Sequence, residues 1–145
     1  MAQEQEGQLV IFELGDQKYA LPILETQEIM RMVNITRVPN TNYFVEGVIN
    51  LRGNVIPVIN LCARLGLDKK PYDQDTRIIV VDRDGQKVGM IVDRVQEVGR
   101  YTAEELDTGT GGARFGGTGN NGDVLSGVVK KGDQLWLLLD LSKLL

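Results

Sequence analysis

The chain has 145 residues and a net charge of −4, from sixteen Lys and Arg against twenty Asp and Glu. That length fits one domain or two tightly coupled small units, and 42% hydrophobic with 25% charged residues is typical of a globular protein and excludes disorder or collagen. The absence of histidine excludes a Ser-His-Asp triad and histidine metal ligands. A single cysteine, Cys62, excludes an intrachain disulfide. With an acidic N-terminus and no long apolar run, the sequence predicts a soluble cytoplasmic protein.

Apolar segments on either side of short turn sequences predict four β-hairpins. The segment 25–33 is predicted to be a strand, and short helical turns are predicted at 41–45, 61–67 and 141–145. This pattern predicts an all-β architecture of closed or nearly closed sheets. The predicted turns, in chain order, are Gly15-Asp16, Arg52-Gly53-Asn54, Asp84-Gly85 and Lys131-Gly132-Asp133.

The sequence repeats once. Residues 17–23 align with 86–92 at an offset of 69, and residues 55–65 align with 135–145 at an offset of 80. The offset grows by 11 residues within a region that contains the glycine-rich segment 109–122. We interpret residues 8–67 and 77–145 as two copies of one β unit related by a pseudo-twofold. Units of this size bury little surface alone, so we expect them to share an interface and to be able to exchange strands.

No segment predicts a cofactor, a metal site or catalysis. The sequence Gly117-Thr118-Gly119-Asn120-Asn121-Gly122 matches the dinucleotide pattern, but it lacks a preceding strand and a following helix, so we expect 109–122 to be a flexible loop. Neither half of the chain is basic and the aromatic content is 6%, which argues against nucleic-acid binding. From residues alone, the chain is predicted to be a small β domain that acts as an interaction module.

One run carries a specific resemblance. Residues 44–61, which read FVEGVINLRGNVIPVINL, closely resemble the signature of the CheW family of bacterial chemotaxis coupling proteins. Further matches lie at 9–15, 38–40, 89–95 and 127–145, so the resemblance covers about residues 8–145. The turn sequence Asn50-Leu51-Arg52-Gly53 is its most specific part.

The resemblance implies two five-stranded SH3-like barrels and no catalytic activity or cofactor. It also implies an adaptor that bridges the regulatory domain of the histidine kinase CheA and the cytoplasmic signalling tips of transmembrane chemoreceptors. Such a protein associates with the membrane only indirectly, through receptor arrays, and contacts the receptor tip in a helix-in-groove mode.

The resemblance also implies partner-binding positions, for which we name residues of this chain. Glu28 and Arg52 are expected to form an ion pair that shapes the binding groove. Gly47 and Gly53 could instead be needed only for the backbone conformation. Arg77 departs from the family pattern, in which an apolar residue is common near this position. The full set of expected partner-binding residues is Thr26, Glu28, Gly47, Arg52, Arg77, Ile78, Val95 and Val98.

Two alternatives stay open at this point. Within the family, the chain could be a CheW-like regulatory domain of CheA or of a CheV-type protein, although a start at Met1 about seven residues before the first strand favours a free-standing adaptor. In another class, it could be a small β-barrel that binds an oligonucleotide or a metabolite, which the acidic charge and few aromatic residues disfavour.

Overall fold

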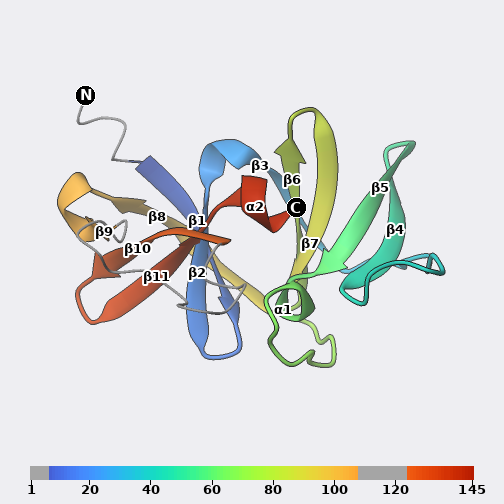
Figure 1. The fold of residues 1–145 in the computed structure, drawn as a ribbon, viewed down its shortest axis with the longest axis horizontal. Helices are drawn as coiled ribbons and strands as arrows, with labels where there is room; N and C mark the ends of the chain where they lie inside the picture. Colours follow the sequence, from blue (N-terminus) through green and yellow to red (C-terminus); the bar gives the residue numbers. More distant parts are fainter. Residues whose placement is uncertain (1–6, 108–123) are drawn as a thin grey trace. The chain divides into compact units, whose positions relative to one another are not determined.

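The computed structural model describes residues 7–107 and 124–145, and most of them lie in strands (Figure 1). The predicted mainly β fold with short helices is confirmed. The glycine-rich segment 109–122, which the sequence predicts to be a flexible loop, lies outside the described residues. The strands are β1 (Gly7–Leu14), β2 (Gln17–Pro22), β3 (Thr26–Arg31), β4 (Val45–Leu51), β5 (Asn54–Asn60), β6 (Arg77–Arg83), β7 (Gln86–Val92), β8 (Arg94–Tyr101), β9 (Leu106–Asp107), β10 (Leu125–Lys131) and β11 (Gln134–Leu139). The helical elements are η2 (Ile23–Glu25), α1 (Leu61–Arg64), η3 (Ala103–Glu105) and α2 (Leu141–Leu144).

The described strands form two sheets. Sheet A has six strands in the order β8-β1-β2-β11-β10-β9, and sheet B has five strands in the order β3-β6-β7-β5-β4. The sixth strand of sheet A is β9, which has only two residues. The chain divides into two compact units, one made of residues 24–95 and the other of the residues before and after them. We call residues 24–95 unit 2 and the remainder unit 1.

All four predicted hairpins are present. Their two-residue turns are closed by the cross-strand pairs Leu14↔Gln17, Leu51↔Asn54, Arg83↔Gln86 and Lys131↔Gln134. The segment 25–33, whose apolar residues satisfied no period cleanly, contains the strand β3. Its burial alternates along the strand, as expected for a strand with one face toward a core.

The helical turn predicted at 41–45 is wrong. Asn40 has a positive φ of 61°, which breaks the chain direction just after Pro39. A single turn follows, in which the N–H of Val45 donates to the carbonyl of Asn42 at 2.9 Å, and β4 begins at Val45. The extended pairing of β4 with β5 therefore prevails over the local capping signal of Asn40. The other two predicted helices are present but short, at 61–64 and 141–144.

Each sheet combines hairpins from both sequence repeats. In sheet A the hairpin β1–β2 is joined to the hairpin β10–β11 by a parallel pairing of β2 with β11. In sheet B the hairpin β6–β7 is joined to the hairpin β4–β5 by a parallel pairing of β5 with β7. The correspondence extends to the helices, since Asn60 caps α1 and Asp140, 80 residues later, caps α2. This correspondence supports the internal duplication, which stays a prediction.

Each unit has its own apolar core. In sheet A, Trp136 packs with Leu9, Ile11 and Val129, and the partly buried Tyr101 and Leu106 cover them. In unit 2 the core forms on the inner face of sheet B, where partly buried methionines from β3 and the residues after it pack against the buried side chains. The buried members of the unit 2 core are Ile49, Ile56, Val58, Ile78, Val80 and Ile91.

Gly47 has a backbone role in unit 2. It lies at a bulge in β4, where its φ is 147° and where an added Cβ would come within 2.0 Å of the carbonyl oxygen of Thr36. That close approach accompanies the bridge between Thr36 and Val48, which shields the edge strand β4. Gly53 also has a positive φ, of 86°, but an added Cβ there would meet nothing within 4 Å.

We therefore predict that Gly47→Ala strongly destabilises unit 2 whereas Gly53→Ala is tolerated. Gly47→Ala should lower the free energy of unfolding by about 3 kcal/mol, because it combines backbone strain with a clash against another backbone. Gly53→Ala should cost about 1 kcal/mol, from the left-handed conformation alone. Urea denaturation followed by circular dichroism measures both, and equal losses would contradict the packing argument for Gly47.

Candidate partner-binding site

An ion pair joins the two ends of sheet B. Glu28 lies in β3 and Arg52 in the turn between β4 and β5, so the two residues belong to opposite ends of the strand order. The Arg52 Nη1 atom lies 2.7 Å from Glu28 Oε1, and Nη2 lies 3.1 Å from Oε2, which is bidentate geometry. The predicted pair is therefore present. Its formation requires the sheet to curl until β3 approaches the β4–β5 hairpin, as in a barrel.

The turn that carries Arg52 has an unusual backbone for that residue. Arg52 has a φ of 50° and Gly53 a φ of 86°, as the type I′ hairpin turn requires. The other described residues that combine a side chain with a positive φ are Asn40 and Asp84, two residue types that tolerate this region. In the repeat, Gly132 stands 80 positions after Arg52 and has a φ of 60°. A long cationic side chain thus occupies a backbone position that favours glycine or asparagine.

The turn is braced and the pair is solvent-accessible. Asn50 Oδ1 accepts a hydrogen bond from the N–H of Gly53 at 2.9 Å. The Arg52 side chain is 69% exposed and the Glu28 side chain 29%. The hydrogen bonds from Arg52 hold the pKa of Glu28 below its usual range, and the same bonds raise the pKa of Arg52. The pair therefore stays ionised as the pH falls toward the pKa of a free glutamate side chain. Because the pair is exposed, salt screens the attraction between the two charges.

Replacing Arg52 should separate stability from binding. We predict that Arg52→Asn keeps the fold and changes the melting temperature by no more than about 3 °C, because asparagine suits the left-handed backbone while the lost pair is exposed. Differential scanning calorimetry checks this expectation. A large drop in melting temperature would mean that the pair closes the sheet energetically and that Arg52 is foremost a structural residue.

The remaining expected positions of unit 2 differ in exposure. Thr26 begins β3 beside a bulge against β6 and is partly buried. Ile78 is a fully buried member of the unit 2 core, so any effect of its substitution on binding would act through packing. Arg77 is partly buried at the start of β6, where its Nη1 atom donates to the carbonyls of Gln74 at 2.8 Å and Thr76 at 3.0 Å.

The last two expected positions lie on β8, an edge strand of sheet A. Val95 is partly buried and is the last residue of unit 2. Val98 belongs to unit 1 and is 51% exposed, which is high for a valine in a strand. Within unit 2, then, the structure brings Glu28 and Arg52 into direct contact, whereas Val98 stands in the other unit.

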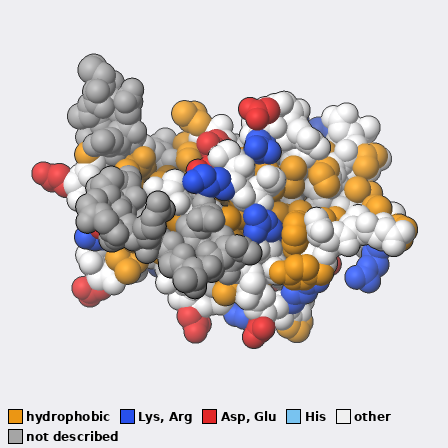
Figure 2. Space-filling model, in the orientation of Figure 1, with side chains coloured by type: hydrophobic (Ala, Val, Ile, Leu, Met, Phe, Trp, Pro, Cys, Tyr) orange, Lys and Arg blue, Asp and Glu red, His pale blue; other side chains and the backbone are white. Residues whose placement is uncertain are grey.

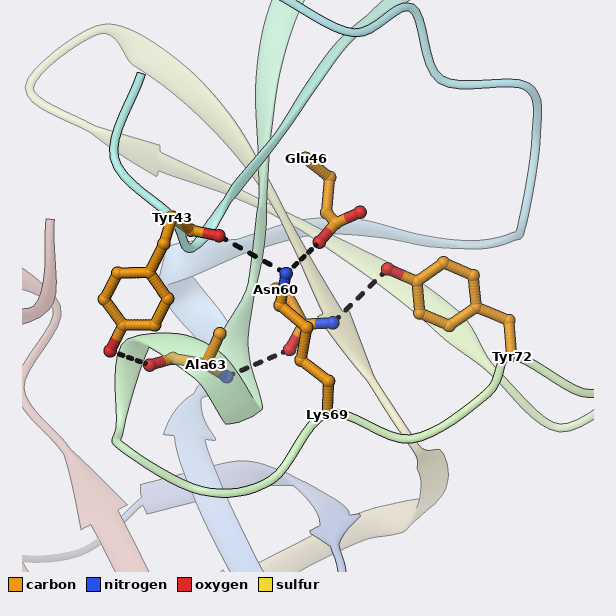
Figure 3. A network of polar contacts seen from close by, with 6 residues as sticks. All are labelled: Tyr43, Glu46, Asn60, Ala63, Lys69 and Tyr72. Atoms are coloured by element: carbon orange, nitrogen blue, oxygen red, sulfur yellow. Dashed lines mark hydrogen bonds and ion pairs between the residues drawn. The ribbon is translucent and has the colours of Figure 1, made fainter. Parts of the chain in front are cut away.

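A polar network that the sequence did not predict fastens the segment after α1 to the start of β4 (Figure 3). The Lys69 Nζ atom lies 3.1 Å from Glu46 Oε2 and donates to the carbonyl of Tyr43 at 3.3 Å. The buried Asn60 caps α1 by accepting from the N–H of Ala63 at 3.0 Å, and its Nδ2 atom donates to the Tyr72 hydroxyl at 3.3 Å. The Asn-Leu pair at the end of β5 signals the cap, but nothing in the sequence indicates its partner twelve residues later.

Cys62 lies beside this network and is unreactive by environment. It is buried in α1, with its Sγ atom 3.8 Å from Asp93 Oδ1, and Lys70 Nζ lies 3.6 Å from Asp93 Oδ2. Desolvation, followed by the negative charge of Asp93, raises the pKa of Cys62 to about 11. The nearby Lys70 opposes this shift but does not cancel it.

We predict slow alkylation of Cys62 in the native protein. At pH 8 a thiol with a pKa near 11 has about a hundredfold less thiolate than an unperturbed cysteine, so reaction with a thiol reagent should slow by at least that factor relative to the protein in urea. The pKa is raised in the folded state, so this thiol favours the folded state below the unfolded pKa, and that contribution is lost as the pH rises toward 11. Fast native reaction at pH 8 would contradict the assigned environment.

Across the described ranges 7–107 and 124–145, no three Cys, Asp or Glu side chains are grouped so that they could hold a metal ion. None of the helices in these ranges is both long and apolar enough to cross a membrane.

Comparison with known proteins shows which family this chain resembles. The family model of the CheW-like domain matches residues 8–145. The chemotaxis protein CheW of Helicobacter pylori is 35% identical over 142 residues, which cover 98% of this chain and 83% of that protein. The chemotaxis protein CheW of Klebsiella aerogenes is 36% identical over 146 residues, with 100% of this chain and 86% of that protein covered.

A solved structure agrees with the computed one. The crystal structure of the scaffolding protein TtCheW from Thermoanaerobacter tengcongensis matches with a TM-score of 0.82 and 34% identity, over 92% of this chain and 88% of that chain. The mainly β architecture with its two sheets is thus of the CheW-like class. The chain belongs to the CheW family.

Proposed function

We propose that this protein is a chemotaxis scaffold that couples the cytoplasmic signalling tips of chemoreceptors to the regulatory domain of the kinase CheA. Its relatives carry the name chemotaxis protein CheW, and the solved neighbour is described as a scaffolding protein. The observation that carries the proposal is the display of Arg52. Its backbone is held in a left-handed turn and its guanidinium is fixed by Glu28, although neither feature is needed to form a hairpin.

The surroundings of Arg52 suit a protein partner. Val55 lies three residues away at the start of β5 and is 68% exposed. Figure 2 shows hydrophobic side chains gathered on the surface of unit 2 over the β4–β5 hairpin, with lysine and arginine side chains around them. An exposed apolar residue close to a positioned arginine is typical of sites where another protein docks.

The test is direct binding with a matched control. The purified protein is titrated with the CheA regulatory domain and, separately, with a soluble receptor-tip fragment from the same organism. The variants are Arg52→Ala and, as the control, Asp84→Ala, which alters the equivalent left-handed position in the β6–β7 turn of the same sheet. Circular dichroism confirms that each variant is folded.

We expect the wild-type protein to bind both partners. Arg52→Ala should weaken binding to one of them by about tenfold, the loss typical of a fixed interface arginine, and Asp84→Ala should change neither affinity by more than about twofold. A folded wild-type protein that binds neither partner at concentrations on the order of 50 µM would overturn the proposal.

A further inference from the structure

The two hairpin turns of sheet B are built alike. In each, a residue with a side chain takes the first turn position with a positive φ, 50° at Arg52 and 55° at Asp84, and a glycine follows it. In each, a side-chain oxygen two residues before that position accepts a hydrogen bond from the N–H of the glycine. These bonds run from Gly53 to Asn50 Oδ1 at 2.9 Å and from Gly85 to Asp82 Oδ1 at 2.8 Å. The same brace therefore supports the same backbone conformation twice.

The brace accompanies a side chain in the left-handed conformation rather than the hairpin as such. In the sequence repeat, Lys130 stands 80 positions after Asn50. Its ammonium group has only donors, and it pairs with Asp107 at 3.6 Å. The first turn position there is Gly132, which adopts a φ of 60° at no steric cost. Glycine needs no brace in this conformation, whereas a residue with a Cβ is strained in it.

The brace from Asn50 acts on the peptide that joins Arg52 to Gly53. That peptide is planar, so a bond to the Gly53 N–H orients the backbone next to the Arg52 Cα. The direction in which the arginine side chain leaves the turn depends on this backbone. An arginine that is 69% exposed has many accessible rotamers. A fixed starting direction therefore raises the fraction of time that its guanidinium spends bonded to Glu28.

The two braces differ in charge. Asn and Asp can both brace a turn through a side-chain oxygen. The turn without an arginine uses the carboxylate of Asp82, whereas the turn that carries Arg52 uses the neutral amide of Asn50. From the 2.9 Å bond and backbone dimensions, Asn50 Oδ1 lies within about 5.5 Å of the Arg52 Cα. A carboxylate at this place would be within reach of the arginine side chain and would compete with Glu28 for it.

We propose that Asn50 is a positioning residue for Arg52: its side-chain oxygen sets the direction of the arginine, and its lack of charge leaves the guanidinium to Glu28. The consequence for binding rests on the proposed function, in which Arg52 contacts a partner protein. The positioning itself is a property of the free protein and is measured without a partner.

Two substitutions separate the two properties of Asn50. Asn50→Ala removes the acceptor, whereas Asn50→Asp keeps the acceptor and adds a charge. Asp82→Ala is the matched control, because it removes the equivalent brace from the turn without an arginine. The Glu28 carboxyl is titrated by NMR at low salt in the full-length wild-type protein and in each variant, with a melting curve for each. Lys87, which also acts on Glu28, is the same in all of them.

The titrations have expected directions. In the wild-type protein, the bonds from Arg52 hold the pKa of Glu28 below its usual value. Asn50→Ala and Asn50→Asp should both raise this pKa, because the guanidinium leaves Glu28 more often. Asp82→Ala should not raise it, since loss of a negative charge acts in the opposite direction. The carboxyl introduced by Asn50→Asp should titrate at lower pH than the same carboxyl in a protein that also carries Arg52→Asn, which shows that it shares the guanidinium.

An unchanged Glu28 titration in Asn50→Ala overturns the inference, whether or not the protein binds a partner. It is equally overturned if the introduced carboxyl does not respond to Arg52→Asn.

Binding is then measured with the partner whose affinity depends on Arg52. Both Asn50 variants should raise the Kd by about fourfold, less than the loss expected for Arg52→Ala, and Asp82→Ala should change it by less than about twofold. If the titrations shift but the Asn50 variants bind like the wild-type protein, Asn50 has no role in binding. If the titrations shift and the wild-type protein binds neither partner, the proposed function fails while the positioning of Arg52 by Asn50 stands.

Discussion

The parallel pairing of β5 with β7 is the contact on which unit 2 depends. It joins a hairpin from the first repeat to a hairpin from the second, through the pairs from Val58↔Gly89 to Asn60↔Ile91. The approach is close enough that a Cβ on Gly89 would lie 2.9 Å from Ile78 Cγ2 and 3.3 Å from Val58 Cγ2. Without this pairing sheet B would separate into the three strands β3-β6-β7 and the two-stranded ribbon β5-β4, and such a ribbon is marginal in water by itself. With it, β3 and β4 become the two ends of one curled sheet.

That curl explains how the site is assembled. Glu28 and Arg52 are 24 residues apart and stand at opposite ends of the strand order, yet their side chains meet at 2.7 Å. The exposed ion pair contributes little to the free energy of folding. The strand pairing of the sheet therefore brings the two side chains together, and the ion pair adds little to the stability of the sheet. The fold thereby presents the Arg52 guanidinium from a turn in which the backbone of Arg52 has a positive φ. This conformation is strained for a residue with a long side chain.

Local signals predicted the elements whose formation is itself local. Asp84-Gly85 and the three similar turns were correctly located because each contains a glycine, the residue type that most readily adopts the positive φ found in each turn. Asn40 shows the limit of such signals, since a residue that can cap a helix here adopts a positive φ before a strand. The network of Asn60 and Tyr72 was not predictable, because it depends on how the segment after α1 folds back. For a related reason the sequence did not predict that Arg31 stands opposite Arg77, which only the register of β3 against β6 decides.

The sequence by itself determined the mainly β class, the four hairpins and the family, because turn chemistry, alternation and a specific motif are all read over short stretches of chain. The pair of Glu28 and Arg52 was expected only through the family resemblance. The tertiary structure decided which hairpins share a sheet, that Ile78 is buried while Val98 is exposed, and that Gly47 is required by its approach to Thr36. Those features depend on pairings between strands distant in the chain. Many registers satisfy the same apolar pattern, and only the packing of a complete core selects one of them.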